Sequence, residues 1–154
     1  MYTDLWSFAV ALYARPGIEK ACLELQSEGA DVCLLLCGAW LGQRGVTMSA
    51  ERLAQLQGIA GPWQAEVVKP LRQLRQQWRQ GASGDNELAT LRKQVKELEL
   101  EAERRLLARL ETLSLQWPAD EGGDPLLWLQ GIATHVPNHH RDALQVLRAA
   151  ASRV

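Results

Sequence analysis

Residues 86–117 constrain the fold of this 154-residue chain more than any other segment, because they contain neither proline nor glycine. The segment is rich in Leu, Glu, Lys, Arg, Gln and Ala, which favour helix. At 1.5 Å per residue, one continuous helix over this segment would be about 48 Å long. A compact globule of this chain length is only roughly 40 Å across. The sequence therefore predicts a helix that projects from the body of the protein or is held by a partner.

The rest of the sequence also shows helical periodicity, with no strand-like alternation longer than a few residues. Residues that commonly cap helix N-termini precede the apolar segments: Asp4, Asp31, Ser49, Asp85 or Asn86, Asp124 and Asn138. Residues 32–41 are apolar on nearly all sides of their predicted helix. This pattern indicates that the helix is the buried centre of the fold.

Proline and glycine divide the chain into the predicted helices. Pro16 suits the first position of the second helix. We expect Gly61 and Pro62 to break the fourth helix at its C-terminal end. Pro70 lies inside the fifth predicted helix and should kink or interrupt it near residues 66–69, because proline cannot donate a backbone hydrogen bond.

A short glycine-containing link, residues 81–84, joins the fifth predicted helix to the long helix. Short links between long helices produce antiparallel hairpins. The apolar residues of the long helix are predicted to form a single stripe: Leu88, Leu91, Val95, Leu98, Ala102, Leu106, Leu110, Leu113 and Trp117. We therefore predict an all-α fold in one domain, with a compact helical body (about residues 1–70 and 100–154) and a long helical hairpin arm (about residues 71–99).

Composition places the chain among ordinary globular proteins. Its apolar fraction is 47%, its charged fraction is 23% and its formal net charge is −1, so no global basic excess draws it to nucleic acid or anionic membranes. The N-terminal apolar residues follow Asp4 rather than a basic region, unlike a signal peptide. The longest strongly apolar segment has about half the length that a membrane span needs. We expect a cytoplasmic protein with no membrane partner.

The three cysteines, Cys22, Cys33 and Cys37, are one group of potential metal ligands. Three thiolates could hold a metal ion. However, no C-x-x-C motif occurs, and free cysteine is a common small core residue. An odd number of cysteines, two of them in an apolar segment, also argues against a disulfide framework. We favour buried, reduced thiols.

Three histidines near the C-terminus form a second group: His135, His139 and His140. Together with Asp142 they could form a zinc or nickel site. Because Pro137 interrupts their spacing, we favour surface histidines at the start of the last helix. The sequence contains no H-E-x-x-H motif, no glycine-rich phosphate loop and no G-x-S-x-G motif. We therefore expect no cofactor.

Basic residues recur along the fifth predicted helix, and we call them the basic row: Lys69, Arg72, Arg75 and Arg79. Trp78 lies beside this row at the same helical spacing. One hypothesis is that the row binds an anion or nucleic acid on a helical arm. The other hypothesis, which we favour, pairs its arginines with glutamates of the facing helix, namely Glu97, Glu99, Glu101 and Glu103. The basic row and Trp78 are the candidate binding residues of this sequence.

Several short strings in the first two thirds of the chain carry a family resemblance. They are Leu5-Trp6-x-Phe8, Leu12-Tyr13-x-x-Pro16-Gly17, Ala21-Cys22-Leu23-x-Leu25-Gln26, Gly29-Ala30-Asp31-Val32-x-Leu34-Leu35-Leu36, Trp40, Trp63 and Val68-x-Pro70-Leu71-Arg72-x-Leu74-Arg75. Over roughly residues 4–110 the chain resembles a family of small uncharacterised bacterial proteins, a domain of unknown function. The resemblance implies a helical fold and no particular reaction.

Three hypotheses about function remain open at this point. The first is a helical interaction or regulatory module that presents its hairpin, or the groove between arm and body, to another protein or to a second copy of itself. The alternative is a nucleic-acid-associated protein that uses the basic row. The third is a small-molecule-binding protein or enzyme with its site between body helices. We rank the third last because no general acid, base or nucleophile stands out in the sequence.

Overall fold

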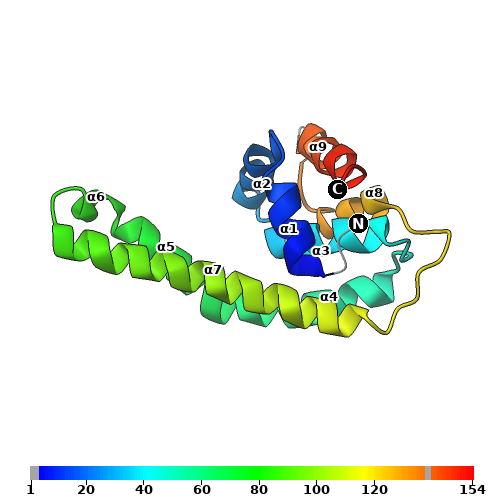
Figure 1. The fold of residues 1–154 in the computed structure, drawn as a ribbon, viewed down its shortest axis with the longest axis horizontal. Coiled ribbons are helices and arrows are strands. Elements are labelled where there is room, and N and C mark those ends of the chain that lie inside the picture. The colour runs from blue at the N-terminus through cyan, green and yellow to red at the C-terminus, as the bar shows by residue number, and fades with distance from the viewer. Residues whose placement is uncertain (1–3, 138–139) are drawn as a thin grey trace.

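The computed structural model describes residues 4–137 and 140–154 of the chain. The predicted all-α fold is confirmed, because these residues form helices and no strand (Figure 1). The helices are α1 (Leu5–Tyr13), α2 (Ile18–Ser27), α3 (Val32–Gln43), α4 (Ala50–Trp63), a π-helix (Gln64–Val68), α5 (Lys69–Gln77), α6 (Arg79–Ala82), α7 (Asn86–Ser114), α8 (Pro125–Ile132) and α9 (Arg141–Ala151). None of them combines the length and the apolar character that a membrane-crossing helix needs.

The predicted helix caps that lie in the described residues are confirmed. The Asp4 side chain accepts a hydrogen bond from the Ser7 N–H at 2.9 Å, and Asp31 accepts one from the Leu34 N–H at 3.2 Å. The remaining caps follow the same pattern: Ser49 at α4, Asp85 at α7 and Asp124 at α8. Each cap satisfies a backbone donor that the helix itself leaves unpaired. The predicted cap Asn138 lies outside the described residues.

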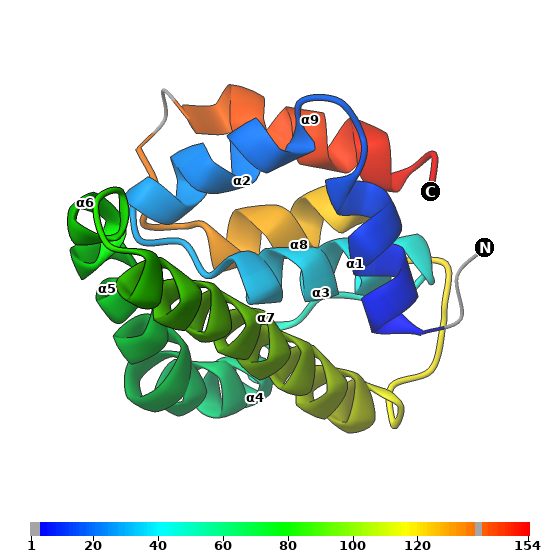
Figure 2. The same cartoon turned by 60° about the vertical axis from the view of Figure 1, so that its left-hand side comes forward.

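Helix α3 is the buried centre of the fold, as its all-round apolar sequence predicts. Every residue from Cys33 to Gly42 is buried. Helix α3 packs closely along α8, while α2 and α9 run side by side above them (Figure 2). The close approach depends on Gly42, because a Cβ at this position would overlap the backbone of Pro125. Helices α1 and α7 cover other sides of α3.

The predicted antiparallel hairpin is present. Helices α5 and α6 pack against α7, and together they extend beyond the other helices (Figure 1). The link is shorter than predicted, because residues 79–82 form α6 and only residues 83–85 remain between the helices. Helix α7 ends at Ser114 rather than Trp117. Pro118 accounts for the exclusion of Trp117, since proline disfavours the helical conformation of the residue before it.

Of the predictions for Pro16, Pro62 and Pro70, one is correct and two are wrong. Pro70 follows a π-helix in which the Lys69 N–H donates to the Gln64 carbonyl, so the predicted interruption is confirmed. Pro62, however, does not break α4, which continues through Trp63 into this π-helix. Both Pro62 and the residue four positions before it, Gly58, are exposed. Water can therefore satisfy the carbonyl that loses its partner.

The second wrong prediction concerns the start of α2. Pro16 does not occupy its first position, because α2 begins at Ile18. Gly17 precedes the helix with a φ of 82°, in the left-handed region. Glycine adopts this conformation without the steric cost that a Cβ would add. The chain therefore turns at Gly17 before the helix begins.

The predicted single stripe along α7 is wrong within the hairpin. Leu91 and Leu98 are 49% and 57% exposed. Arg92 and Glu99 face α5 instead: the Arg92 Nε donates to the Arg75 carbonyl at 2.9 Å, and Glu99 binds the Arg75 side chain. Guanidinium groups removed from water require an acceptor. This requirement turns α7 so that its polar residues, and not these two leucines, meet α5.

Candidate functional site

The basic row meets a single glutamate of α7. The Arg72 Nε donates to Glu99 Oε2 at 3.0 Å. Arg75 donates to both carboxylate oxygens, from Nε at 2.6 Å and from Nη2 at 3.3 Å. The Glu99 side chain is 8% exposed, and those of Arg72 and Arg75 are 17% and 24% exposed. The favoured hypothesis of pairing across the hairpin is therefore confirmed for these two arginines, with Glu99 as the shared partner.

The pKa shifts of Glu99 and Arg75 favour the charged form of each group. Burial raises the pKa of Glu99, but the hydrogen bonds from Arg75 and Arg72 outweigh burial and hold the pKa below its ordinary value. The hydrogen bond to Glu99 in turn raises the pKa of Arg75. The other two members of the basic row, Lys69 and Arg79, are exposed, and the neighbouring Trp78 is half-buried. As a binding surface, the row stays a prediction.

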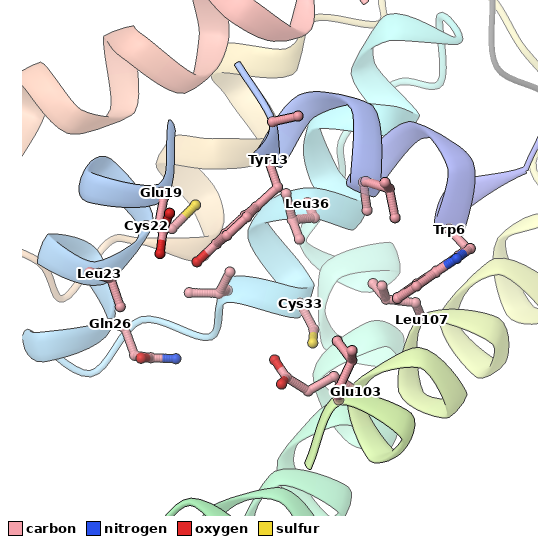
Figure 3. Close-up of a pocket in the computed structure, with 15 residues that line it drawn as sticks. Trp6, Tyr13, Glu19, Cys22, Leu23, Gln26, Cys33, Leu36, Glu103 and Leu107 are labelled. Carbon is pink, nitrogen blue, oxygen red and sulfur yellow. The ribbon is translucent and has the colours of Figure 1, made fainter. Parts of the chain in front are cut away.

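A pocket of about 520 Å³ lies between α1, α2, α3 and α7 (Figure 3). This volume is within the range of roughly 300–1,000 Å³ that is typical of ligand sites. Its walls are mainly apolar side chains, including Trp6, Val10, Leu23, Leu36, Leu100 and Leu107. On α7 the pocket begins directly beside the ion-paired Glu99, so it adjoins the base of the hairpin.

Four of the apolar side chains that line this pocket are exposed to solvent. Val10 is 51% exposed, Tyr13 37%, Leu23 53% and Leu100 56%. They come from three different helices, α1, α2 and α7. Large apolar side chains that gather in one place on a surface mark sites of interaction more often than the same residues scattered singly.

Three polar side chains point into the pocket from different helices: Tyr13 from α1, Cys33 from α3 and Glu103 from α7 (Figure 3). Burial raises the pKa of Tyr13 to about 12 and raises the pKa of Cys33 well above its ordinary value. Both groups are therefore neutral near pH 7. Burial, followed by the charge of neighbouring Glu99, raises the pKa of Glu103 to about 7. Glu103 thus changes its charge near neutral pH.

The arrangement is better suited to binding than to covalent chemistry. The thiols in the pocket, Cys22 and Cys33, are protonated because burial raises both pKa values, and only the thiolate is a strong nucleophile. In the part of the chain that the structure describes, no histidine, lysine or arginine lines the pocket. The pocket can bury an apolar group and offer carboxylate, amide and hydroxyl groups to a polar one.

The structure does not assemble either group of potential metal ligands, among the residues that it describes, into a metal site. Cys22, Cys33 and Cys37 are free thiols in the core. The His140 Nε2 lies 3.1 Å from Glu28 Oε1, and His139 falls outside the described residues. Throughout residues 4–137 and 140–154, no three His, Cys, Asp or Glu side chains are arranged to hold a metal ion.

The sequence did not identify the residues that line the pocket. The polar residues of the pocket are separated by up to ninety positions, and no motif connects them. One signal was available: Leu23 lies on the charged outward side of α2, and Leu100 lies off the apolar stripe of α7. An apolar residue on a solvent-facing side of an amphipathic helix indicates a possible contact surface. That signal could identify the two leucines but not the partners that they meet.

A comparison with protein families identifies one match. Residues 4–110 match the family described as "Protein of unknown function (DUF2390)". The matched segment contains the whole hairpin link and every residue that lines the pocket. The comparisons with curated proteins and with solved structures give no match. Since the matched segment covers more than half of the sequence, the chain belongs to the DUF2390 family of proteins of unknown function.

Proposed function

We propose that this protein is an interaction module whose pocket between α1, α2, α3 and α7 receives apolar side chains from a segment of another protein. The observation that carries the proposal is the convergence of Val10, Tyr13, Leu23 and Leu100 on one pocket, although each is exposed. We include in this proposal the division into a body and a hairpin arm of residues 71–99. We also propose a cytoplasmic location, because the three cysteines are free thiols in the core.

The energetics favour an apolar occupant. Burial of an exposed leucine or valine side chain contributes about 1.5–3 kcal/mol when it is complete. Val10, Leu23 and Leu100 each have about half of their surface still to bury. Three such side chains together can contribute about 3 kcal/mol to binding, before any contact from the deeper walls. This free energy becomes available only when a partner covers the three side chains.

The crosslinking experiment described below can also reveal other occupants of the pocket. A second copy of this chain could fill the pocket, and so could a small amphipathic molecule, which the volume of about 520 Å³ would accommodate. The hypothesis of nucleic-acid binding has less support, because Arg72 and Arg75 of the basic row are ion-paired with Glu99. The two remaining cations of the row, Lys69 and Arg79, make only a weak electrostatic site for a phosphate backbone.

The test is site-specific photo-crosslinking in cells that produce the protein. In one variant a photoreactive amino acid replaces Leu100, which lines the pocket. In the matched control it replaces Leu115, which is 63% exposed and lies outside the pocket. We expect a protein adduct from position 100 and not from position 115. An adduct of twice the chain's mass would identify a second copy. Equal adducts at both positions, or none at position 100, would contradict the proposal.

Alanine variants measure the contribution of the pocket. The double variant Leu23→Ala/Leu100→Ala removes about 1 kcal/mol of burial at each site, so binding of the crosslinked partner should weaken about 30-fold. The matched variant Leu115→Ala/Leu127→Ala changes two exposed leucines elsewhere and should bind normally. Both should unfold at nearly the wild-type temperature, because all four side chains are already exposed. Equal affinities would show that the partner binds another surface.

A further inference from the structure

The charged groups that line the pocket are acidic. Among residues 4–137 and 140–154, two carboxylates, Glu19 and Glu103, line it, and no lysine, arginine or histidine does. Glu19 lies on the exposed side of α2, whereas Glu103 is half-buried on α7. An apolar pocket whose only charged lining groups are acidic attracts an occupant that carries a positive charge.

Glu103 is the carboxylate without a partner. Its neighbour Glu99 takes the hydrogen bonds of both Arg72 and Arg75. Among the described residues, nothing donates a hydrogen bond to Glu103, and it forms no ion pair. A desolvated carboxylate that lacks hydrogen bonds is destabilised in its charged form. Its side chain nevertheless points toward the open pocket (Figure 3).

Several charged groups surround Glu103, and their effects oppose one another. Glu99 and Asp31 raise the pKa of Glu103 after the larger effect of burial, whereas Arg72 and Arg75 lower it. The result is a pKa of about 7. The arginines therefore do not compensate for burial. A cation brought by the occupant would act directly on the carboxylate that they leave unsatisfied.

Resting on the proposed function, we infer that the partner's segment is basic and amphipathic, and that one of its lysines or arginines pairs with Glu103 while its apolar side chains fill the pocket. The long aliphatic stem of such a residue can lie along the apolar walls while its charged end reaches the carboxylate. The Tyr13 ring, which stays a neutral phenol, offers a face for the same cation. Glu19 at the exposed side would attract further basic residues of the segment.

The inferred ion pair makes binding depend on pH. The cation needs an ionised Glu103, and a group with a pKa of about 7 is roughly 10% ionised at pH 6 and 90% ionised at pH 8. Affinity should therefore rise up to about tenfold between these values. A partner that instead accepted a hydrogen bond from protonated Glu103 would bind less tightly as the pH rises. The sign of the pH dependence separates these two arrangements.

The first experiment repeats the crosslinking from position 100 in two backgrounds. Glu103→Gln removes the charge in the pocket, and Glu101→Gln removes an exposed charge outside it as the matched control. We expect the yield of the protein adduct to fall about five- to tenfold in Glu103→Gln only. An unchanged yield would overturn the inferred ion pair and leave the proposed function intact. If the protein that carries neither substitution gives no adduct from position 100, the proposed function itself is overturned.

The second experiment uses purified protein and two small probes, hexylammonium chloride and hexanol, followed by NMR titration. We expect hexylammonium to shift the amide signals of pocket residues such as Tyr13 and Cys33, and to bind about five- to tenfold more weakly to Glu103→Gln. Hexanol, which lacks the charge, should bind both proteins alike. Equal hexylammonium affinities for wild type and Glu103→Gln, or no shifts at the pocket, would overturn the inference. Binding of hexylammonium without any protein adduct in cells would identify a free amine as the occupant.

Discussion

Replacing Glu99 with glutamine should cost more stability than any other single change of charge in the hairpin. The substitution keeps the shape of the side chain but removes the carboxylate that Arg72 and Arg75 share. The glutamine side chain keeps one oxygen that can accept a hydrogen bond. Its NH₂ group can only donate, and so can the two guanidinium groups that it faces. At least one guanidinium therefore loses its acceptor.

The size of the effect follows from the burial of the cluster. Removing one partner of a fully buried ion pair costs about 3–5 kcal/mol. The guanidinium groups here keep some contact with water, since Arg72 and Arg75 are 17% and 24% exposed. We therefore expect a loss of about 2–3 kcal/mol for Glu99→Gln. For a domain of this size, such a loss lowers the melting temperature by roughly 5–10 °C.

The assay is urea unfolding followed by circular dichroism, with Glu101→Gln as the matched control. Glu101 forms an exposed pair with Arg105 at 3.2 Å on the same helix. Removing it should cost about 0.5 kcal/mol or less. Equal losses of stability in the two variants would refute the reasoning, because the shielded cluster would then contribute no more than a surface pair.

The dependence on pH gives an independent check. The folded-state pKa of Glu99 lies below its ordinary value of 4.5, so its contribution is present above that value. The contribution is lost as the pH falls through the folded-state pKa, because protonation then removes the charge in both states. The difference in stability between wild type and Glu99→Gln should therefore narrow on acidification from pH 5. A difference that stays constant down to pH 2 would contradict the assignment.

Two further predictions concern the pocket and the centre of the fold. Because the pKa of Glu103 rises from 4.5 to about 7 on folding, wild type loses stability as the pH rises through this interval. After allowance for the partial exposure of Glu103, the Glu103→Gln variant should be more stable than wild type by about 1–2 kcal/mol at pH 8. At pH 4.5 the two proteins should be similarly stable. Equal urea midpoints at pH 8 would contradict this prediction. Gly42→Ala should cost about 3 kcal/mol because its Cβ would overlap the Pro125 backbone. The control Gly58→Ala, with nothing within 4 Å of its Cβ, should instead stabilise α4 by about 0.5–1 kcal/mol, as thermal melting can show.

The helix starts could be predicted from sequence because a cap is a local interaction. Asp4 and Asp31 bind backbone N–H groups only three residues ahead. The residue types and their spacing therefore decide the geometry without reference to the rest of the chain. The apolar character of residues 32–41 likewise identifies the central helix, because a helix with no polar side must be buried.

The side of α7 that faces α5 could not be predicted from the apolar pattern. Leu91 and Leu98 have the correct spacing for a packed stripe, yet they are exposed. The orientation of α7 depends on the ion pairs of Glu99 with α5, and the strength of these pairs depends on how far water is excluded. Exclusion of water is a property of the packed helices and not of either helix alone.

The sequence by itself determined that this chain forms helices, where most of them begin and which one is buried, because these properties depend on hydrogen bonds and periodicity within a few residues. The tertiary structure alone decided the pocket. It brings Tyr13, Leu23, Cys33 and Glu103 together from four helices (Figure 3). Only this packing removes Glu103 from water beside Glu99 and raises its pKa, since desolvation and the field of a neighbouring charge arise from distances in space rather than along the chain.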